Sequence, residues 1–252
     1  MPILSPSTAS LLHLLFEAAA YAIAFAIYTR TRRSDPSALT QEQGLGLILG
    51  AAVGALIGAK LLAWLEAPFD PAVLLRLDPL ALQGKTIVGG ILGGWIGVEV
   101  SKARLHIGRP TGDAFAFALV AGIAIGRVGC FLAGLRDGTF GTPTDRPWGV
   151  DFGDGVRRHP TQLYEVAFLV ALGLVLARAR RRARPQGELF LLFVAGYMVF
   201  RVAVENLKPR HALVGGLSPI QIAALLGAAA AVGVLLRRRT ARASVRPERA
   251  VA

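Results

Sequence analysis

The sequence predicts an all-α fold, a polytopic transmembrane bundle of about seven helices, and composition and patterning both lead to it. The 252 residues are 54% hydrophobic and 17% charged, which is more apolar and less charged than a typical soluble domain. The mean hydropathy is +0.52. Apolar stretches of roughly 20 residues, the length that crosses a bilayer as a helix, recur throughout with short polar loops between them. One transmembrane domain over residues 1–240, followed by a basic disordered tail over 241–252, is the simplest organisation.

Seven segments of the chain are expected to form the helices. They are residues 11–28, 44–65, 86–100, 113–133, 162–177, 188–205 and 217–236. The first is expected to be retained rather than cleaved, because TRTRR follows it in place of a small-residue cleavage site and no basic segment precedes it. The third and fifth are short for a span and require a break or partial burial at one end.

Basic residues gather at alternate ends of these segments. They follow the first, third, fifth and seventh helices, at residues 30–33, 102–109, 178–184 and from 237 onward. Such ends are usually cytoplasmic, so the N-terminus is expected outside and the C-terminus inside. This placement accounts for the net charge of +12 without a nucleic-acid partner.

Ionisable residues also lie within the apolar segments, where they are costly and are usually kept for a ligand, a pathway or a pairing. With the expected orientation, five of them fall in the outer half of the bilayer: Lys60, Arg127, Glu165, Arg201 and Glu205. A guanidinium binds phosphate in a bidentate manner, and a phospholipid headgroup is the anion available at that depth. The alternative is that the two arginines pair with the two glutamates only to hold the bundle together.

Glycines line the second and third segments at helical spacing. They are Gly50, Gly54 and Gly58 in the second, and Gly89, Gly90, Gly93, Gly94 and Gly97 in the third. Such stripes let helix backbones approach closely, so tight packing is expected. The pair at 89 and 90, near a helix end, could also leave room for a ligand.

The loop between the fourth and fifth segments is rich in Gly, Pro and Asp, and it is longer than a minimal connector needs to be. It carries Trp148 as an expected interfacial anchor and ends at His159, on the side where the charges gather. Cys130 is the single cysteine and no cysteine spacing indicates a metal site, so neither a metal nor a cofactor is predicted. Apolar packing is the simplest role for Cys130, and a thiol activated by Arg127 is the alternative.

Four segments together resemble the prolipoprotein diacylglyceryl transferases of bacterial inner membranes. They read GRVGCFLAGLRDG at 126–138, RHPTQLYE at 158–165, GYMVFRVAVE at 196–205 and LSPIQ at 217–221. In that family, phosphatidylglycerol donates its diacylglyceryl group to a lipobox cysteine thiol of a secreted preprotein, and glycerol phosphate is released. The resemblance implies a multi-pass inner-membrane transferase, with phosphatidylglycerol or a similar anionic phospholipid and a prolipoprotein as partners.

The resemblance also implies roles for particular residues. Arg127 and Arg201 would hold the phosphate and stabilise charge on the leaving group. Tyr197 would face the same cavity, Glu205 would orient Arg201, and His159 would support the outer rim with Glu165. The catalytic candidates are therefore Arg127, Arg201 and His159, and the substrate-binding candidates are Lys60, Gly89, Gly90, Gly129, Gly138, Glu165, Tyr197 and Glu205.

The chain departs from the family pattern at several polar positions. Val88 stands where the family has the histidine of an HGG motif, and Cys130 stands where its signature has an asparagine. Other family side chains are replaced by Ala133, Leu135 and Glu17. The sequence therefore indicates a divergent branch, in which Lys85 or His159 is hypothesised to replace the missing base.

Two other functions remain open on the same residues. A protein that binds or moves phospholipid without chemistry would tolerate the lost polar side chains. A proton-coupled transporter would need acidic residues spread through both leaflets, whereas here they cluster on one side.

Overall fold

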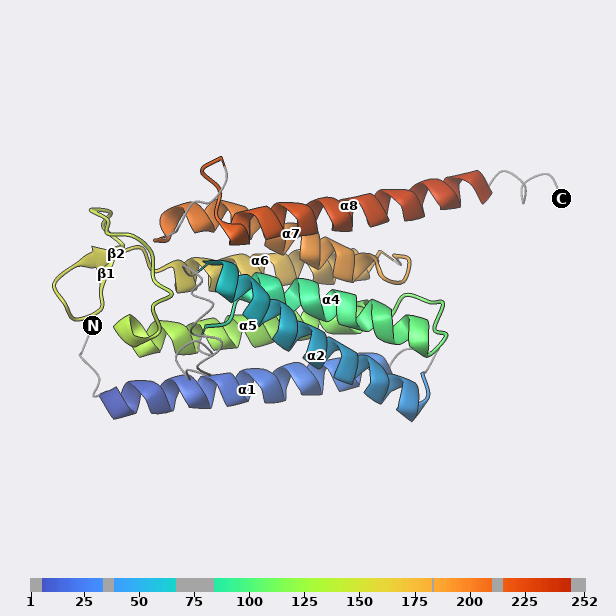
Figure 1. Ribbon diagram of the computed structural model, residues 1–252, viewed down its shortest axis with the longest axis horizontal. Coiled ribbons are helices and arrows are strands. Elements are labelled where there is room, and N and C mark those ends of the chain that lie inside the picture. Colours follow the sequence, from blue (N-terminus) through green and yellow to red (C-terminus); the bar gives the residue numbers. More distant parts are fainter. Residues whose placement is uncertain (1–5, 34–38, 67–83, 183, 210–214, 246–252) are drawn as a thin grey trace. The chain divides into compact units, whose positions relative to one another are not determined.

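A computed structural model describes residues 6–33, 39–66, 84–182, 184–209 and 215–245 (Figure 1). Within them lie seven α-helices: α1 (Pro6–Arg33), α2 (Gln41–Glu66), α4 (Ile87–Arg104), α5 (Asp113–Ala133), α6 (Thr161–Arg180), α7 (Glu188–Val204) and α8 (Pro219–Val245). Two 3-10 helices, η1 (Gly134–Arg136) and η2 (Glu205–Leu207), follow α5 and α7. A two-stranded sheet is formed by β1 (Val150–Asp151) and β2 (Arg157–Arg158).

Each of the seven predicted segments is a helix. The bounds predicted for the fourth, residues 113–133, are those of α5. α1 and α8 extend beyond their predicted C-terminal ends, because the arginine-rich sequences that follow their apolar cores favour the helix. α1 also begins earlier than predicted, at Pro6. α8 continues to Val245, so the first residues of the predicted tail are helical, and the rest of that tail lies outside the described residues. The division into one domain and a tail stays a prediction.

Five of the described helices are long and apolar enough to cross a membrane: α1, α2, α5, α6 and α8. Large apolar side chains on them are exposed, among them Leu14, Leu49 and Leu226, as expected of surfaces that face lipid. α4 is only 18 residues long and carries three charged residues near its end, and α7 is 17 residues long. The all-helical membrane prediction is thus confirmed, and spanning by α4 and α7 stays a prediction.

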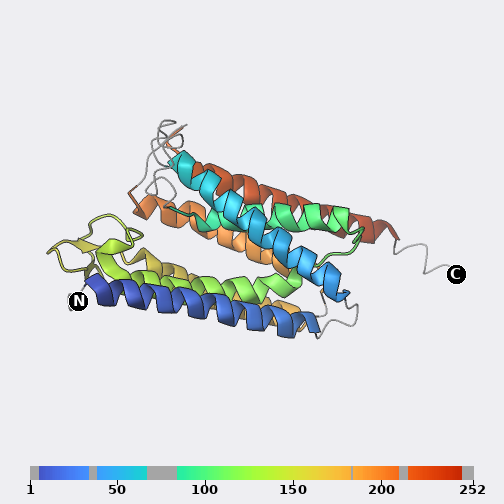
Figure 2. The same cartoon turned by 60° about the horizontal axis from the view of Figure 1, so that its bottom comes forward.

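The helices divide into two compact units. Unit 1 contains the described residues of 1–38, 111–184 and 203–210, and unit 2 contains those of 39–110, 185–202 and 211–252. In unit 1, α5 lies beside α1 and α6 (Figures 1 and 2). A Cβ at Gly129 would lie 2.5 Å from the Cβ of Phe16, so α1 and α5 approach closely there. Near the other end, the rings of Tyr28 and Phe115 lie 4.5 Å apart.

In unit 2, α2 packs against α4 (Figure 2). Glycines of the two helices face one another at the contact. A Cβ at Gly54 would meet the carbonyl oxygen of Gly93, and a Cβ at Gly58 would meet that of Gly89. The backbones are therefore too close for any side chain at these positions, and the predicted close packing is confirmed.

The start of α8 is fixed by a capping box in the segment LSPIQ. The amide N–H of Gln221 donates to Ser218 Oγ at 3.2 Å, and the amide N–H of Ser218 donates to Gln221 Oε1 at 3.1 Å. Glu66 at the end of α2 also accepts a hydrogen bond, 2.8 Å long, from the amide of Ile220. These bonds satisfy amide groups that a helix start leaves without partners within the helix.

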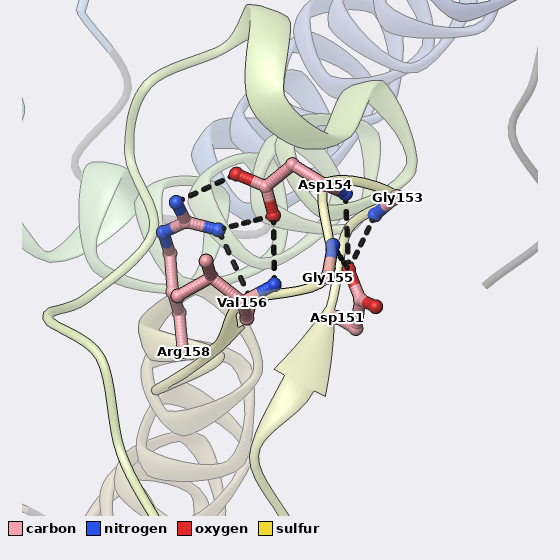
Figure 3. A network of polar contacts seen from close by, with 6 residues as sticks. All are labelled: Asp151, Gly153, Asp154, Gly155, Val156 and Arg158. Carbon is pink, nitrogen blue, oxygen red and sulfur yellow. Dashed lines mark hydrogen bonds and ion pairs between the residues drawn. The ribbon is translucent and has the colours of Figure 1, made fainter.

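The loop between α5 and α6 contains a short antiparallel hairpin that the all-α prediction did not include. Val150 pairs with Arg158 and Asp151 with Arg157. Asp151 Oδ1 accepts hydrogen bonds from the amides of Gly153, Asp154 and Gly155 (Figure 3). These amides lower the pKa of the Asp151 carboxyl, with the Gly153 amide contributing most.

A second carboxylate closes the same hairpin. Asp154 receives two hydrogen bonds from the Arg158 guanidinium, 2.8 and 2.7 Å long (Figure 3). These bonds lower the pKa of Asp154 to about 2. The guanidinium of Arg158 also lies 5.0 Å from the centroid of the Phe140 ring. The loop is therefore held by its own polar residues.

Replacing Asp154 by asparagine is expected to loosen the hairpin at neutral pH, because Arg158 loses its charged partner. Limited proteolysis of residues 145–158 should accelerate several-fold. The folded-state pKa lies below the ordinary value of 3.8, so the wild-type contribution is present above about pH 4 and is lost as the pH falls toward 2. Asp145→Asn, at an exposed position in the same loop, is the control and should cleave like wild type at every pH. Equal cleavage of the Asp154 variant and wild type at neutral pH would contradict the expectation.

Candidate functional site

Arg127 of α5 and Glu165 of α6 form a buried ion pair within unit 1. Arg127 Nε lies 2.8 Å from Glu165 Oε2, and the two side chains are 7% and 1% exposed. Arg127 and Glu165 therefore meet, as both interpretations of the sequence allow, and whether the pair only holds the bundle together is left to the variants described below. A guanidinium carries five N–H donors, and one carboxylate oxygen does not use them all. Pairing with Glu165 and binding of phosphate are therefore compatible.

His159 lies at the end of the loop between α5 and α6, directly before α6 begins. Its Nδ1 lies 3.0 Å from the Tyr164 hydroxyl, which also accepts a hydrogen bond of 2.8 Å from Trp148 Nε1. An indole N–H only donates, so the phenol keeps its own proton available for His159 Nδ1. Backbone bonds to Gly141 and Thr142 fix the histidine further. Tyr164, which the sequence analysis missed, therefore positions His159.

Gln162 is a second residue that the sequence analysis missed. It is 1% exposed, and neither its amide oxygen nor its amide nitrogen has a hydrogen-bond partner among the described residues. Gln162 lies three positions before Glu165, hence on the same face of α6. Buried amides are nearly always satisfied, so this residue is a candidate for contact with a bound polar group. Its position within RHPTQLYE was the only signal in the sequence.

Unit 2 contains Arg201, Tyr197 and Lys60. Arg201 is 4% exposed on α7, and Tyr197 is fully buried, with its ring stacked on Phe193 at 5.8 Å between centroids. Lys60 Nζ donates to the carbonyl oxygen of Gly84 at 3.0 Å. Glu205, which is 3% exposed and follows Arg201 by four residues, belongs to unit 1. The convergence of all five charged groups stays a prediction.

The candidate glycines differ in what surrounds them. Gly89 lies against Gly58 and Gly129 against Phe16, so both serve helix packing. A Cβ at Gly90 would have its nearest neighbours at 3.8 and 3.9 Å, an ordinary contact distance. Gly138 has a φ of +65°, which favours glycine at that position. Their roles in substrate binding stay predictions.

Fold and site together define an integral membrane protein with a few buried charged side chains set among apolar helices. The chain belongs to the prolipoprotein diacylglyceryl transferase family, which it matches over residues 13–237. The resemblance inferred from the motifs is therefore confirmed.

Among its relatives are proteins named phosphatidylglycerol–prolipoprotein diacylglyceryl transferase from several bacteria. The protein of Geobacter sulfurreducens is 35% identical over 81% of this chain and 80% of its own length. The one from Vibrio vulnificus is 33% identical over 76% of this chain and 72% of its own. The one from Dehalococcoides mccartyi is 31% identical over 76% of each chain.

Proposed function

We propose that this chain transfers the diacylglyceryl group of phosphatidylglycerol to a cysteine thiol of a prolipoprotein. Family membership across residues 13–237 is the observation that carries the proposal. In the reaction a sulfur–carbon bond forms at the glyceryl carbon and its bond to the phosphate oxygen breaks. The phosphate leaves as glycerol phosphate, and the thiol proton is released. The nucleophile belongs to the substrate, so the enzyme must bind the phosphate and stabilise its developing charge.

Arg127 and Arg201 are the groups proposed to bind that phosphate. Both are retained within family segments, and both are buried in helices, where a cation is costly unless it serves a partner or a ligand. Glu165 fixes the orientation of Arg127 through the 2.8 Å ion pair. Glu205 is assigned the corresponding role beside Arg201. His159, held by Tyr164, is assigned to the rim of the site together with Glu165, and Lys60, Gly90 and Gly138 stay candidates for binding the substrate.

The finer topology is part of the proposal. Seven helices span the bacterial inner membrane as one domain, with the N-terminus outside and the C-terminus in the cytoplasm. Basic residues in the last turns of α1, α4 and α6 support this orientation, because such ends are usually cytoplasmic. The candidate charges then lie toward the outer leaflet, where a secreted preprotein and a phospholipid headgroup both reach them.

A lipid-binding protein without catalytic activity is the alternative, and one observation favours it. Val88, at the position of the missing family histidine, is fully buried in the first turn of α4. No imidazole is therefore supplied from that position. His159 or Lys85 must replace it if the chain needs a base there.

Complementation separates the two functions. The wild-type gene is expected to restore lipidation of a reporter preprotein in a strain depleted of its own transferase, and Arg201→Ala is expected to restore none. Both proteins should reach the membrane in equal amounts, as measured by immunoblot of the membrane fraction. Failure of the wild-type chain to restore lipidation at normal membrane levels would favour the non-catalytic alternative.

A further inference from the structure

Three residues that offer metal ligands meet in unit 1, beside Arg127. They are His13 of α1, Cys130 of α5 and Asp137, which follows η1. One ligand atom from each lies within 4.8 Å of the other two, and all three residues are half-buried. The spacing of residues in the sequence does not predict this cluster, because its three members come from separate elements of the fold.

The separation between His13 and Asp137 fits two ligands of one ion better than a direct contact. His13 Nδ1 lies 3.7 Å from Asp137 Oδ1, which is too long for a hydrogen bond. Nitrogen and oxygen ligands that each lie about 2.0–2.2 Å from a tetrahedral Zn²⁺ are about 3.4 Å apart. His13 Nδ1 is also buried and has no hydrogen-bond partner among the described residues.

The surroundings of the cluster match the outer contacts that metal ligands usually make. His13 Nε2, the other ring nitrogen, faces Glu17 Oε2 at 3.9 Å. Thr139 donates its hydroxyl to Asp137 Oδ2, the carboxylate oxygen that does not face His13. A histidine that binds metal through one nitrogen commonly presents the other to a carboxylate, and ligating carboxylates are themselves hydrogen-bonded. Tyr21 holds Glu17 in turn, with a hydrogen bond of 3.3 Å.

The local charge permits a cation. A guanidinium nitrogen of Arg127 lies 3.8 Å from Cys130 Sγ, which by itself disfavours a metal ion. Glu165 offsets that positive charge through the buried ion pair. A deprotonated Cys130, with Asp137 and Glu17, adds three negative charges around the cluster. Arg136, which donates to Ser10 one turn before His13 on α1, adds one positive charge, and the sum around the cluster stays negative.

We propose that His13, Cys130 and Asp137 bind a thiophilic divalent cation, with Zn²⁺ as the best fit. A thiolate, an imidazole and a carboxylate are the ligand types that Zn²⁺ takes, and water would complete the tetrahedron. The Cys130 thiol releases its proton to solvent when the ion binds. The site goes beyond the proposed lipid transfer and does not depend on it. It links α1 to the end of α5, so bound metal stabilises unit 1.

Cobalt substitution tests the site, because Co²⁺ bound to a thiolate gives an intense near-ultraviolet charge-transfer band. The full-length protein, purified in detergent and stripped with a chelator, should bind one Co²⁺ per chain with that band, and one added Zn²⁺ should displace it. Cys130→Ser should abolish the band. Asp137→Asn and His13→Gln should keep it but weaken binding at least tenfold. Glu17→Gln should weaken binding about 10–100-fold.

His106→Asn is the matched control. His106 is exposed, lies in unit 2 and has a φ of +53°, which asparagine tolerates. Its Co²⁺ spectrum and affinity should be those of wild type. A wild-type protein without a thiolate band, or a Cys130→Ser variant that binds Co²⁺ as tightly as wild type, would overturn the proposal. Should Cys130→Ser fold poorly, unchanged affinity in Asp137→Asn would overturn it equally.

Discussion

Arg127→Ala is expected to abolish lipid transfer, lowering the rate by at least about 100-fold, as removal of a preorganised charge-stabilising group does elsewhere. The same substitution leaves Glu165 buried without its cation, which costs about 3–5 kcal/mol of stability. Activity per folded molecule must therefore be measured, with the folded fraction taken from size-exclusion chromatography in detergent.

The double variant Arg127→Ala/Glu165→Gln separates catalysis from packing. It removes both charges of the pair, so stability should return close to wild type while activity stays absent. If the pair only holds the bundle together, as the sequence alternative has it, activity should return together with stability. Arg157→Ala, at an exposed position on β2, is the control and should transfer lipid normally.

Gly54→Ala is expected to cause a large loss of stability in unit 2. The added Cβ would meet the carbonyl oxygen of Gly93, which is backbone and cannot rotate away. α2 and α4 must then separate, at about 1–3 kcal/mol. Alanine also brings a gain of up to about 1 kcal/mol in helix propensity, so the cost of separating the helices must exceed that gain for stability to fall. Thermal unfolding in detergent should show a clearly lower Tm.

Gly90→Ala is the matched control for stability. It lies on the neighbouring helix, and its added Cβ would find its nearest atom at 3.8 Å. Its Tm should equal or exceed that of wild type, because only the helix propensity changes. An equal loss of Tm in both variants would show that the close approach of Gly54 and Gly93 is not what stabilises the pair.

The helices were predictable because their signal is local. Apolar runs located all seven, although the third and fifth are short for a span, and the bounds of α5 were predicted to the residue. The glycine stripes of α2 and α4 predicted their close packing for the same reason, since helical spacing places the glycines on one face. Helix ends were less predictable, because arginines favour both an interface and a continued helix.

The site was only partly predictable because its contacts join residues distant in sequence. Charge placement indicated that Arg127 and Glu165 would meet, but the roles of Tyr164 and Gln162 depend on neighbours that no motif spacing reveals. The hairpin is closed by Asp154 and Arg158 within a loop whose composition suggests only turns. Cys130 gave no metal signal for the same reason, since its potential co-ligands come from other elements.

The central claim is that the chain forms a thioether from a phospholipid and a cysteine. Its most direct test uses the purified protein in nanodiscs, with phosphatidylglycerol labelled in the headgroup and a peptide that carries a lipobox. The account predicts one glycerol phosphate released for each lipidated cysteine, and no release when that peptide cysteine is serine. An inserted, folded protein that produces no lipidated peptide, or that releases glycerol phosphate without it, would contradict the account.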